Sequence, residues 1–484
     1  MPSPVSIFLD FNLPNATTWF YFSFLLAIAL FFKFSRLLSI RNLDVVMIFL
    51  LVPGLLVVQA ARPQPIAFEK QPAVQIAALV GQAALPDTPA ALAEHAWRFS
   101  DQCGAALERP RWLWYGYLWL FLGSLYFFCR CIFDLTLVQR PALAPNLQIG
   151  GLAWLAGALL ICLLAVAYRQ VERDIHPAPT NGNASAPVLL MQSHDQSVFA
   201  VTVLWQDWPT WAVAALAFAG HAAVSLGLFF VAWRHFQDLA AGMAAVTFYL
   251  MLPYTGLYVG HLNHVLPMAL FLGTLLAYRY PTLTGGVLGM ATAATYFPVF
   301  VLPIWLSFYR GRGAGRFLIA FLFMLALCLC NIALTLWQND ELERSIQMAL
   351  DSGAWLPWKA PQASLEGFWT GVHWAYRIPV FLVFLSFVLA TTFWPAPKNL
   401  AHVIALSAAV FIGLQWWCAD QGGVYILWYV PLLLLLVFRP NLQDRTAQPI
   451  SAESDWLSRG LAWLARPVRR VLKLRETPVK TTAA

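Results

Sequence analysis

The sequence predicts an all-α protein whose helices cross a membrane many times. Of its 484 residues, 60% are hydrophobic and only 11% are charged, whereas about 25% of residues are charged in soluble domains. The mean hydropathy is +0.65. Apolar runs of about 20 residues, the length that spans a bilayer as a helix, recur along the whole chain. Much of the net charge of +7 lies in one tail, so membrane lipids rather than nucleic acid are the expected partners.

Eleven apolar runs have the length of a single span. They cover 17–35, 43–60, 112–130, 149–168, 210–233, 240–259, 264–278, 317–337, 377–394, 400–417 and 423–438. The stretch 282–309 is too long for one upright helix and too short for two full ones. We therefore predict two short half-spans there, separated by a break near Pro298.

The distribution of Lys and Arg sets the orientation, because cytoplasmic connections carry an excess of both. The cations in or beside the short connections are Lys33, Arg36, Arg41, Arg130, Arg140, Arg234, Arg279, Arg310, Arg312, Arg316 and Lys398. All of them lie on one side if 282–309 goes out and returns. This predicts about thirteen crossings in a plasma (inner) membrane, with the N-terminus outside and the C-terminus in the cytoplasm. The segments 61–111, 169–208 and 338–376 then face outward.

The chain divides into three parts in this scheme. Residues 1–148 form an N-terminal addition of three spans, and 149–440 form the main transmembrane module. Residues 441–484 form a basic cytoplasmic tail in which Trp and Leu alternate with Arg. Such a pattern is typical of an amphipathic segment attracted to anionic lipid, although a tail that only fixes the topology is an equal alternative.

No nucleotide-binding or zinc-protease motif occurs in the sequence. The chain contains no GxxxxGK[ST], no GxGxxG at a helix start and no HExxH. The cytoplasmic connections are also too short for a nucleotide-binding domain. If the protein is an enzyme, its donor is expected to be dissolved in the membrane, and no cofactor is expected.

Two polar clusters interrupt the apolar pattern on the predicted outer side. The first is "GLYVGHLNHVLPMAL" (256–270), which places His261, Asn263 and His264 between two spans, in water at the outer mouth. Two histidines are fewer than the three or four ligands of a zinc site, so a metal site is not predicted, and a divalent ion stays an open alternative. Helix capping and contacts to a phosphate or sugar are the other interpretations.

The second cluster is the loop 351–377, which combines several tryptophans with Lys359, Glu366, His373 and Arg377. An interfacial aromatic belt explains the tryptophans alone. Indole faces with interspersed cations also suit a sugar and a lipid-linked phosphate. Two further polar positions favour plain structural roles: His221 as a hydrogen-bonding residue inside the bundle, and Asp420 in a turn.

Three blocks together resemble the polyprenyl-phosphate-mannose-dependent alpha-mannosyltransferases, a family with the GT-C glycosyltransferase fold. "GLYVGHLNHVLPMAL" resembles the family's G-Q-x-N stretch, "LTGGVLGMATAATYFPVFVLPIWLSFYRGR" its Gly-rich short span with a Pro break, and "APQASLEGFW" its N-Q-S-L-x-G loop. The resemblance covers about 210–435. His261 stands where the family has Gln, Thr295 and Tyr296 stand near its Lys, and Ala360 and Pro361 replace its first Asn.

The resemblance implies a hexosyltransferase that takes a sugar, mannose in the family, from a polyprenyl-phosphate donor on the extracytoplasmic side. The acceptor would be a glycan or a lipid of the cell envelope. The donor phosphate would be bound by His261, Asn263, His264, Lys359 and Arg377, and the substrate loop would contain Gln362, Ser364, Glu366 and Trp369. The family has a catalytic carboxylate in the outer loop that corresponds to 169–208.

Four carboxylates in that loop compete for the role of base, namely Glu172, Asp174, Asp195 and Asp207. Asp174 follows its span by only a few residues, close to the plane of a lipid phosphate, and Arg169 and Arg173 would keep it ionised. We therefore rank Asp174 first, with a helix-end salt bridge as the alternative. A transporter or flippase for a lipid-linked or polar solute is the second functional hypothesis, and a non-catalytic assembly subunit is the third.

Overall fold

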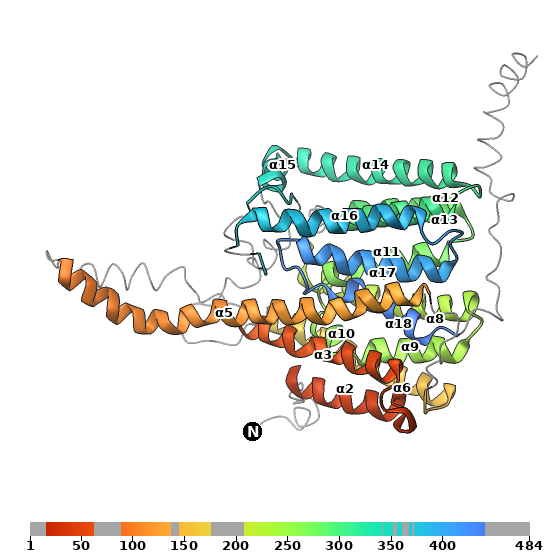
Figure 1. The fold of residues 1–484 in the computed structure, drawn as a ribbon, viewed down its shortest axis with the longest axis horizontal. Coiled ribbons are helices and arrows are strands. Elements are labelled where there is room, and N and C mark those ends of the chain that lie inside the picture. The colour runs from red at the N-terminus through yellow and green to blue at the C-terminus, as the bar shows by residue number, and fades with distance from the viewer. Residues whose placement is uncertain are drawn as a thin grey trace, which may run out of the picture.

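In the part of the chain that the computed structural model describes, all the regular secondary structure is helical (Figure 1). That part comprises residues 16–61, 89–136, 145–175, 208–340, 342–351, 356–360, 367–369 and 372–440. No strand occurs in these ranges. The predicted all-α class is confirmed for them.

The helices form one bundle and run roughly parallel to its long axis (Figure 1). In chain order they are α2 (Ala16–Phe31), α3 (Ile40–Ala61), α5 (Pro89–Asp134), α6 (Ile149–Ile175), α8 (Thr210–Phe230), α9 (Leu239–Met251), α10 (Pro253–Leu257), α11 (Leu262–Leu276), α12 (Pro281–Ala294), α13 (Leu302–Phe308), α14 (Ala314–Gln338), α15 (Leu342–Asp351), α16 (Arg377–Phe393), α17 (Leu400–Trp417) and α18 (Val430–Phe438). Short helical turns η1 (Phe34–Arg36), η3 (Val231–His235), η4 (Phe297–Val301), η5 (Trp374–Tyr376) and η6 (Ile426–Trp428) join some of them.

Within the described ranges, seven helical segments are long and apolar enough to cross a membrane. They are Ile40–Ala61, Arg111–Asp134, Ile149–Arg169, Thr210–His235, Ala314–Gln338, Trp374–Phe393 and Leu400–Trp417. Shorter apolar helices accompany them, including α9 and α11. The chain is therefore an integral membrane protein, and the number of about thirteen crossings stays a prediction.

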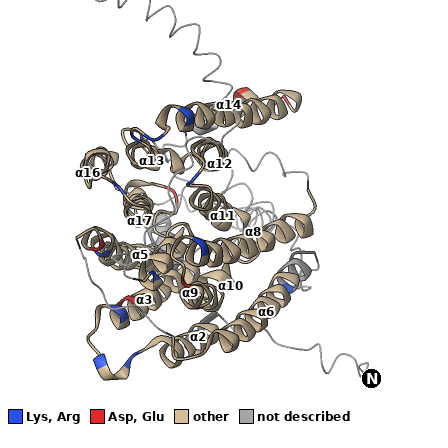
Figure 2. Cartoon of the chain, turned by 90° about the vertical axis from the view of Figure 1, so that its right-hand side faces the viewer, with Lys and Arg blue, Asp and Glu red and all other residues tan. Residues whose placement is uncertain are grey.

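Burial differs sharply between the centre and the rim of the bundle. Nearly all of α17 and α18 is buried, whereas α14 exposes large apolar side chains such as Phe323 and Trp337. Figure 2 views the helices end-on and shows α14 at the edge. Contiguous apolar surface of this kind is rare on soluble monomers, and lipid is the solvent that suits it.

Two observed helices differ from the predicted spans because of a proline. The predicted span 240–259 is split into α9 and α10, because Pro253 has no N–H to continue the helix and begins the next one instead. The predicted span 423–438 becomes helical only from η6 onward, and α18 starts next to Pro431. The other predicted spans differ from the observed helices mainly at their ends, except that α5 begins far before residue 112.

The stretch 282–309 forms a hairpin. Tyr309, after α13, donates a hydrogen bond of 2.5 Å to the carbonyl of Tyr278, which precedes α12. The beginning of α12 and the end of α13 therefore lie at the same end of the bundle. The break falls at Thr295 and Tyr296, slightly before the predicted position, because Pro298 lies inside η4.

Glycines allow α12 to lie directly against α14. A Cβ atom on Gly285 would come within 2.2 Å of the carbonyl oxygen of Phe317, and one on Gly289 within 2.5 Å of that of Phe321. Small residues at such spacing let two backbones approach closely in a membrane. Gly285 and Gly289 thus lie at the contact between α12 and α14.

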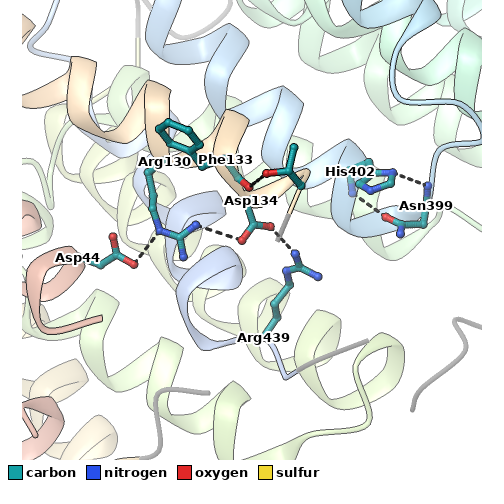
Figure 3. A network of polar contacts seen from close by, with 8 residues as sticks. Asp44, Arg130, Phe133, Asp134, Asn399, His402 and Arg439 are labelled. Atoms are coloured by element: carbon teal, nitrogen blue, oxygen red, sulfur yellow. Dashed lines mark hydrogen bonds and ion pairs between the residues drawn. The ribbon is translucent and has the colours of Figure 1, made fainter. Parts of the chain in front are cut away.

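A buried ion network joins the N-terminal helices to the end of α18 (Figure 3). Arg130 on α5 donates to Asp44 on α3 and to Asp134, each at 3.1 Å. Arg439, directly after α18, also pairs with Asp134, and Tyr126 donates to Asp44 at 2.7 Å. Buried charges are tolerated when they are paired and hydrogen-bonded in this way.

This network belongs to one end of the bundle, where several segments contain Lys or Arg residues (Figure 2). His402 on α17 lies near Arg439, Asp134 and Lys398, and Lys398 donates to the Ser307 hydroxyl of α13 at 2.8 Å. We call it the basic end. The positive-inside rule predicts that it faces the cytoplasm.

Candidate functional site

At the end of the bundle opposite the basic end, three helical segments are interrupted and meet. The first interruption separates α10 from α11 (258–261), the second separates α12 from η4 (295–296), and the third separates α17 from η6 (418–425). Non-helical backbone at membrane depth occurs where it is buried in protein or lines a binding cavity. The convergence of three such breaks marks this end as the candidate site.

The first break contains the polar cluster of the sequence analysis. His261 is the N-cap residue of α11 and is partly exposed. Asn263 and His264, in the first turn of α11, are only 9% and 5% exposed. The expectation that these two side chains stand in water was wrong, because neighbouring breaks cover them.

An aromatic column connects the three breaks. The imidazole of His264 stacks on the ring of Tyr258, with centroids 3.7 Å apart, and lies 5.0 Å from that of Tyr425. Tyr425 stacks on Trp428 at 4.2 Å, and Trp428 contacts Phe297 at 4.4 Å. The indole of Trp428 also donates to the carbonyl of Asn263 at 3.1 Å. The column thus fixes α11 against η4 and η6.

The third break is a tightly built turn. The side chain of Gln415 donates to the carbonyl of Tyr425 and accepts from the N–H of Gly423, both at 3.0 Å. Gln421 and Gly423 have positive φ angles of 48° and 97°. A side chain larger than hydrogen at Gly422 would clash with the Gln415 carbonyl. Backbone strain of this kind clusters at functional sites.

This turn buries a carboxylate among other ionisable groups. Asp420 is fully buried. The thiol of Cys418 donates a hydrogen bond of 3.5 Å to the backbone carbonyl of Asp420. Burial, assisted by the negative charge of Asp420, raises the pKa of Cys418 to about 12. Tyr296 from the second break and Arg377 at the start of α16 lie close enough to the thiol to act on it electrostatically.

Arg377 ties the loop before α16 to this turn. Its guanidinium is fully buried, and it donates to the carbonyl of Trp417 at 3.1 Å and to that of Lys359 at 3.3 Å. The indole of Trp369, from the same loop, donates to the carbonyl of Trp416 at 2.8 Å. Arg377 and Trp369 therefore satisfy two carbonyls at the C-terminus of α17, which no helical N–H can reach.

The N-terminal helices contribute one wall of the site. Ser124 on α5 accepts a hydrogen bond of 2.9 Å from the Trp416 indole. Phe121 contacts Phe368 at 4.9 Å, and Trp114 stacks on the same ring at 5.4 Å. The predicted three-span addition is thus packed directly against the candidate site.

The structure places the five residues predicted to bind a donor, and Trp369 of the predicted substrate loop, at two of the three breaks. His261, Asn263 and His264 lie at the first break, and Lys359, Trp369 and Arg377 lie at the third. Gln362, Ser364 and Glu366 lie outside the described residues, as do Asp195 and Asp207. Asp174 falls in the last turn of α6, where the side chains are also outside the described part.

Sequence reasoning missed the residues that join the breaks to one another. No pattern in the sequence singles out Tyr258, Tyr425 and Trp428 among their apolar neighbours, and Asp420 is interpreted from the sequence as a turn residue. The pair Gly422–Gly423 beside Asp420 was the available signal, because adjacent glycines permit close backbone approach. Among the described residues, no group of three His, Cys, Asp or Glu side chains could hold a metal ion.

Comparisons with known proteins give no relative. No family model matches the chain, and neither a curated protein nor a solved structure matches it. The fold itself defines the class: an all-α integral membrane protein with a polar site at one end of its bundle.

Proposed function

We propose that this protein is a membrane glycosyltransferase that takes a sugar from a polyprenyl-phosphate donor and transfers it to a glycan or lipid acceptor. The observation that carries the proposal is the meeting of three helix breaks around His264, Arg377 and Asp420, opposite the basic end. Because the basic end is expected in the cytoplasm, the reaction takes place on the extracytoplasmic side of the plasma membrane.

Exposed aromatic side chains support a donor anchored in the membrane. Trp112, Trp114, Trp358 and Tyr376 are 38% to 67% exposed and flank the candidate site in the chain or in space. Tryptophan and tyrosine gather at the level of lipid headgroups. The site therefore lies near the depth at which the phosphate of a polyprenyl lipid would lie.

The degree of burial divides the roles among the polar residues. His261 and Lys359 are partly exposed, so the departing phosphate reaches them first, and their hydrogen-bond donors stabilise its charge. Arg377 is covered and fixes the loop that contains Lys359. His264 and Asn263 hold the first break in place.

Transfer also requires a carboxylate that touches the acceptor. It takes the proton from the acceptor hydroxyl while that oxygen attacks the anomeric carbon, and the bond to the phosphate breaks through an oxocarbenium-like state. Asp420 is fully covered, so we assign this role to Asp174 and a positioning role to Asp420.

The test uses purified protein in liposomes with a polyprenyl-phosphate donor whose sugar is radiolabelled, together with candidate glycan and lipid acceptors. Label transferred to an acceptor supports the enzyme, and label that crosses the membrane unchanged identifies a carrier instead. Lys359→Ala is expected to lower transfer. Arg312→Ala, an exposed cation at the basic end, is the matched control and is expected to leave transfer unchanged.

A further inference from the structure

His221 is a fully buried histidine in the middle of α8, far in sequence from the candidate site. Its Nε2 atom lies 3.2 Å from the carbonyl oxygen of Tyr258, and its Nδ1 atom lies 2.7 Å from the hydroxyl of Tyr249. A carbonyl oxygen can only accept, so Nε2 carries the hydrogen. In the neutral ring Nδ1 is then an acceptor, and the Tyr249 hydroxyl donates to it.

The carbonyl that His221 reaches belongs to the first helix break. It also accepts the backbone N–H of His261 at 3.0 Å. The chain leaves the helical path between Tyr258 and His261, so this carbonyl is not part of a continuous helical ladder. His221 therefore gives this carbonyl a second hydrogen-bond donor, which its second lone pair can accept.

The side chain of Tyr258 contacts the two histidines of the site. The ring of Tyr258 stacks on His264 at 3.7 Å and lies 5.8 Å from the ring of His261. Tyr258 is thus held at its carbonyl by His221 and touches both site histidines with its ring.

We propose that His221 is a positioning residue: its hydrogen bond to the Tyr258 carbonyl sets the geometry of the α10–α11 break and, through the Tyr258 ring, the positions of His261 and His264. The kinetic consequence rests on the proposed function, whereas the geometric consequence does not. A shift of about 1 Å in a binding group can cost on the order of 10²-fold in rate. The loss of the hydrogen bond can therefore be measured both as a change in geometry and as a change in rate.

The chain offers a matched control on the same helix. Ser225 is buried one turn after His221 and donates to the His221 carbonyl at 2.9 Å. Its loss removes a buried hydrogen bond from α8 without touching the break. Ser225→Ala therefore reports the effect of a hydroxyl lost from this helix alone.

The experiment measures the ring ¹⁵N resonances of His261 and His264 in full-length protein labelled at its histidines and reconstituted in nanodiscs. The two signals are assigned with His261→Gln and His264→Gln. His221→Leu is expected to shift both signals, Ser225→Ala to leave them in place, and His221→Gln, whose amide can donate to the same carbonyl, to restore them largely. Unchanged signals in His221→Leu, or an equal shift in Ser225→Ala, would overturn the proposal.

A milder variant covers the case in which His221→Leu does not fold. Tyr249→Phe removes only the hydroxyl that donates to Nδ1, and a smaller shift of the His264 signal is expected; no shift counts against the proposal. Transfer by His221→Leu is expected to fall roughly 10-fold or more, with His221→Gln recovering most of it. If the shifts occur but no protein variant, including the unaltered chain, transfers sugar, the proposed function fails and the positioning role stands.

Discussion

The imidazole of His264 lies flat on the phenol ring of Tyr258, with the two centroids 3.7 Å apart and the planes 12° apart. One residue caps the break after α10 and the other lies in the first turn of α11. The stack holds the two sides of the break together, in a place where the backbone alone does not form a continuous helix.

This stack predicts different outcomes for two substitutions of Tyr258. Tyr258→Phe keeps the ring and is expected to retain most sugar transfer. Tyr258→Ala removes an aromatic contact worth about 0.5–1.5 kcal/mol beyond its buried area and frees His264, so transfer is expected to fall by at least about 10-fold. Initial rates of label transfer in liposomes measure both, and equal activity of the two variants would contradict the role of the stack.

The α12–α14 contact predicts a contrast between two adjacent glycines. Gly285→Ala places a Cβ atom 2.2 Å from the Phe317 carbonyl, whereas Gly286→Ala meets only the flexible end of Met324 at 3.9 Å. The first variant is expected to lower the free energy of unfolding by about 1–3 kcal/mol and the second to change it little. Thermal unfolding in detergent measures the difference. Similar unfolding midpoints of the two variants would show that α12 and α14 can move apart without loss of stability.

The assignment of the base predicts a different kind of contrast between two carboxylates. Asp174→Asn is expected to reduce transfer roughly 10²-fold or more while the unfolding midpoint stays unchanged. Asp420→Asn replaces an oxygen of a fully buried carboxyl group with an NH2 group that needs hydrogen-bond acceptors, and it is expected to lower the midpoint itself. Full activity of a folded Asp174→Asn protein would exclude Asp174 as the base.

The out-and-back path of α12 and α13 predicts the side on which two distant segments lie. Arg312→Cys and a cysteine added at the C-terminus are expected to react with a membrane-impermeant maleimide only after the membrane is opened, because both belong to the cytoplasmic side. The unaltered chain gives the background from its own cysteines. Labelling of the two positions from opposite faces would refute the proposed topology.

The sequence was sufficient to predict the helical membrane class and the hairpin at 282–309. Those features depend on the length of apolar runs and on the placement of Arg and Lys, which are local properties of the chain. It was also sufficient to point to His261, His264 and Arg377, because polar residues at the end of a span stand out against apolar neighbours.

The partners of these residues were not predictable in the same way. Tyr258 and Tyr425 lie more than 150 residues apart and meet His264 from two sides. The path of α17 and η6 across the bundle decides which aromatic residues stack. No periodic pattern in the sequence reveals that path. The same holds for Ser124, whose contact with Trp416 depends on where α5 docks.

The most direct measurement of the central claim is an experimental structure of the protein with a polyprenyl-phosphate sugar bound. We expect density for the lipid phosphate beside His261 and Lys359, at the end of the bundle where the three helix breaks meet. Phosphate density at the basic end, near Arg279 or Lys398, or a donor that binds nowhere in this bundle, would contradict the account.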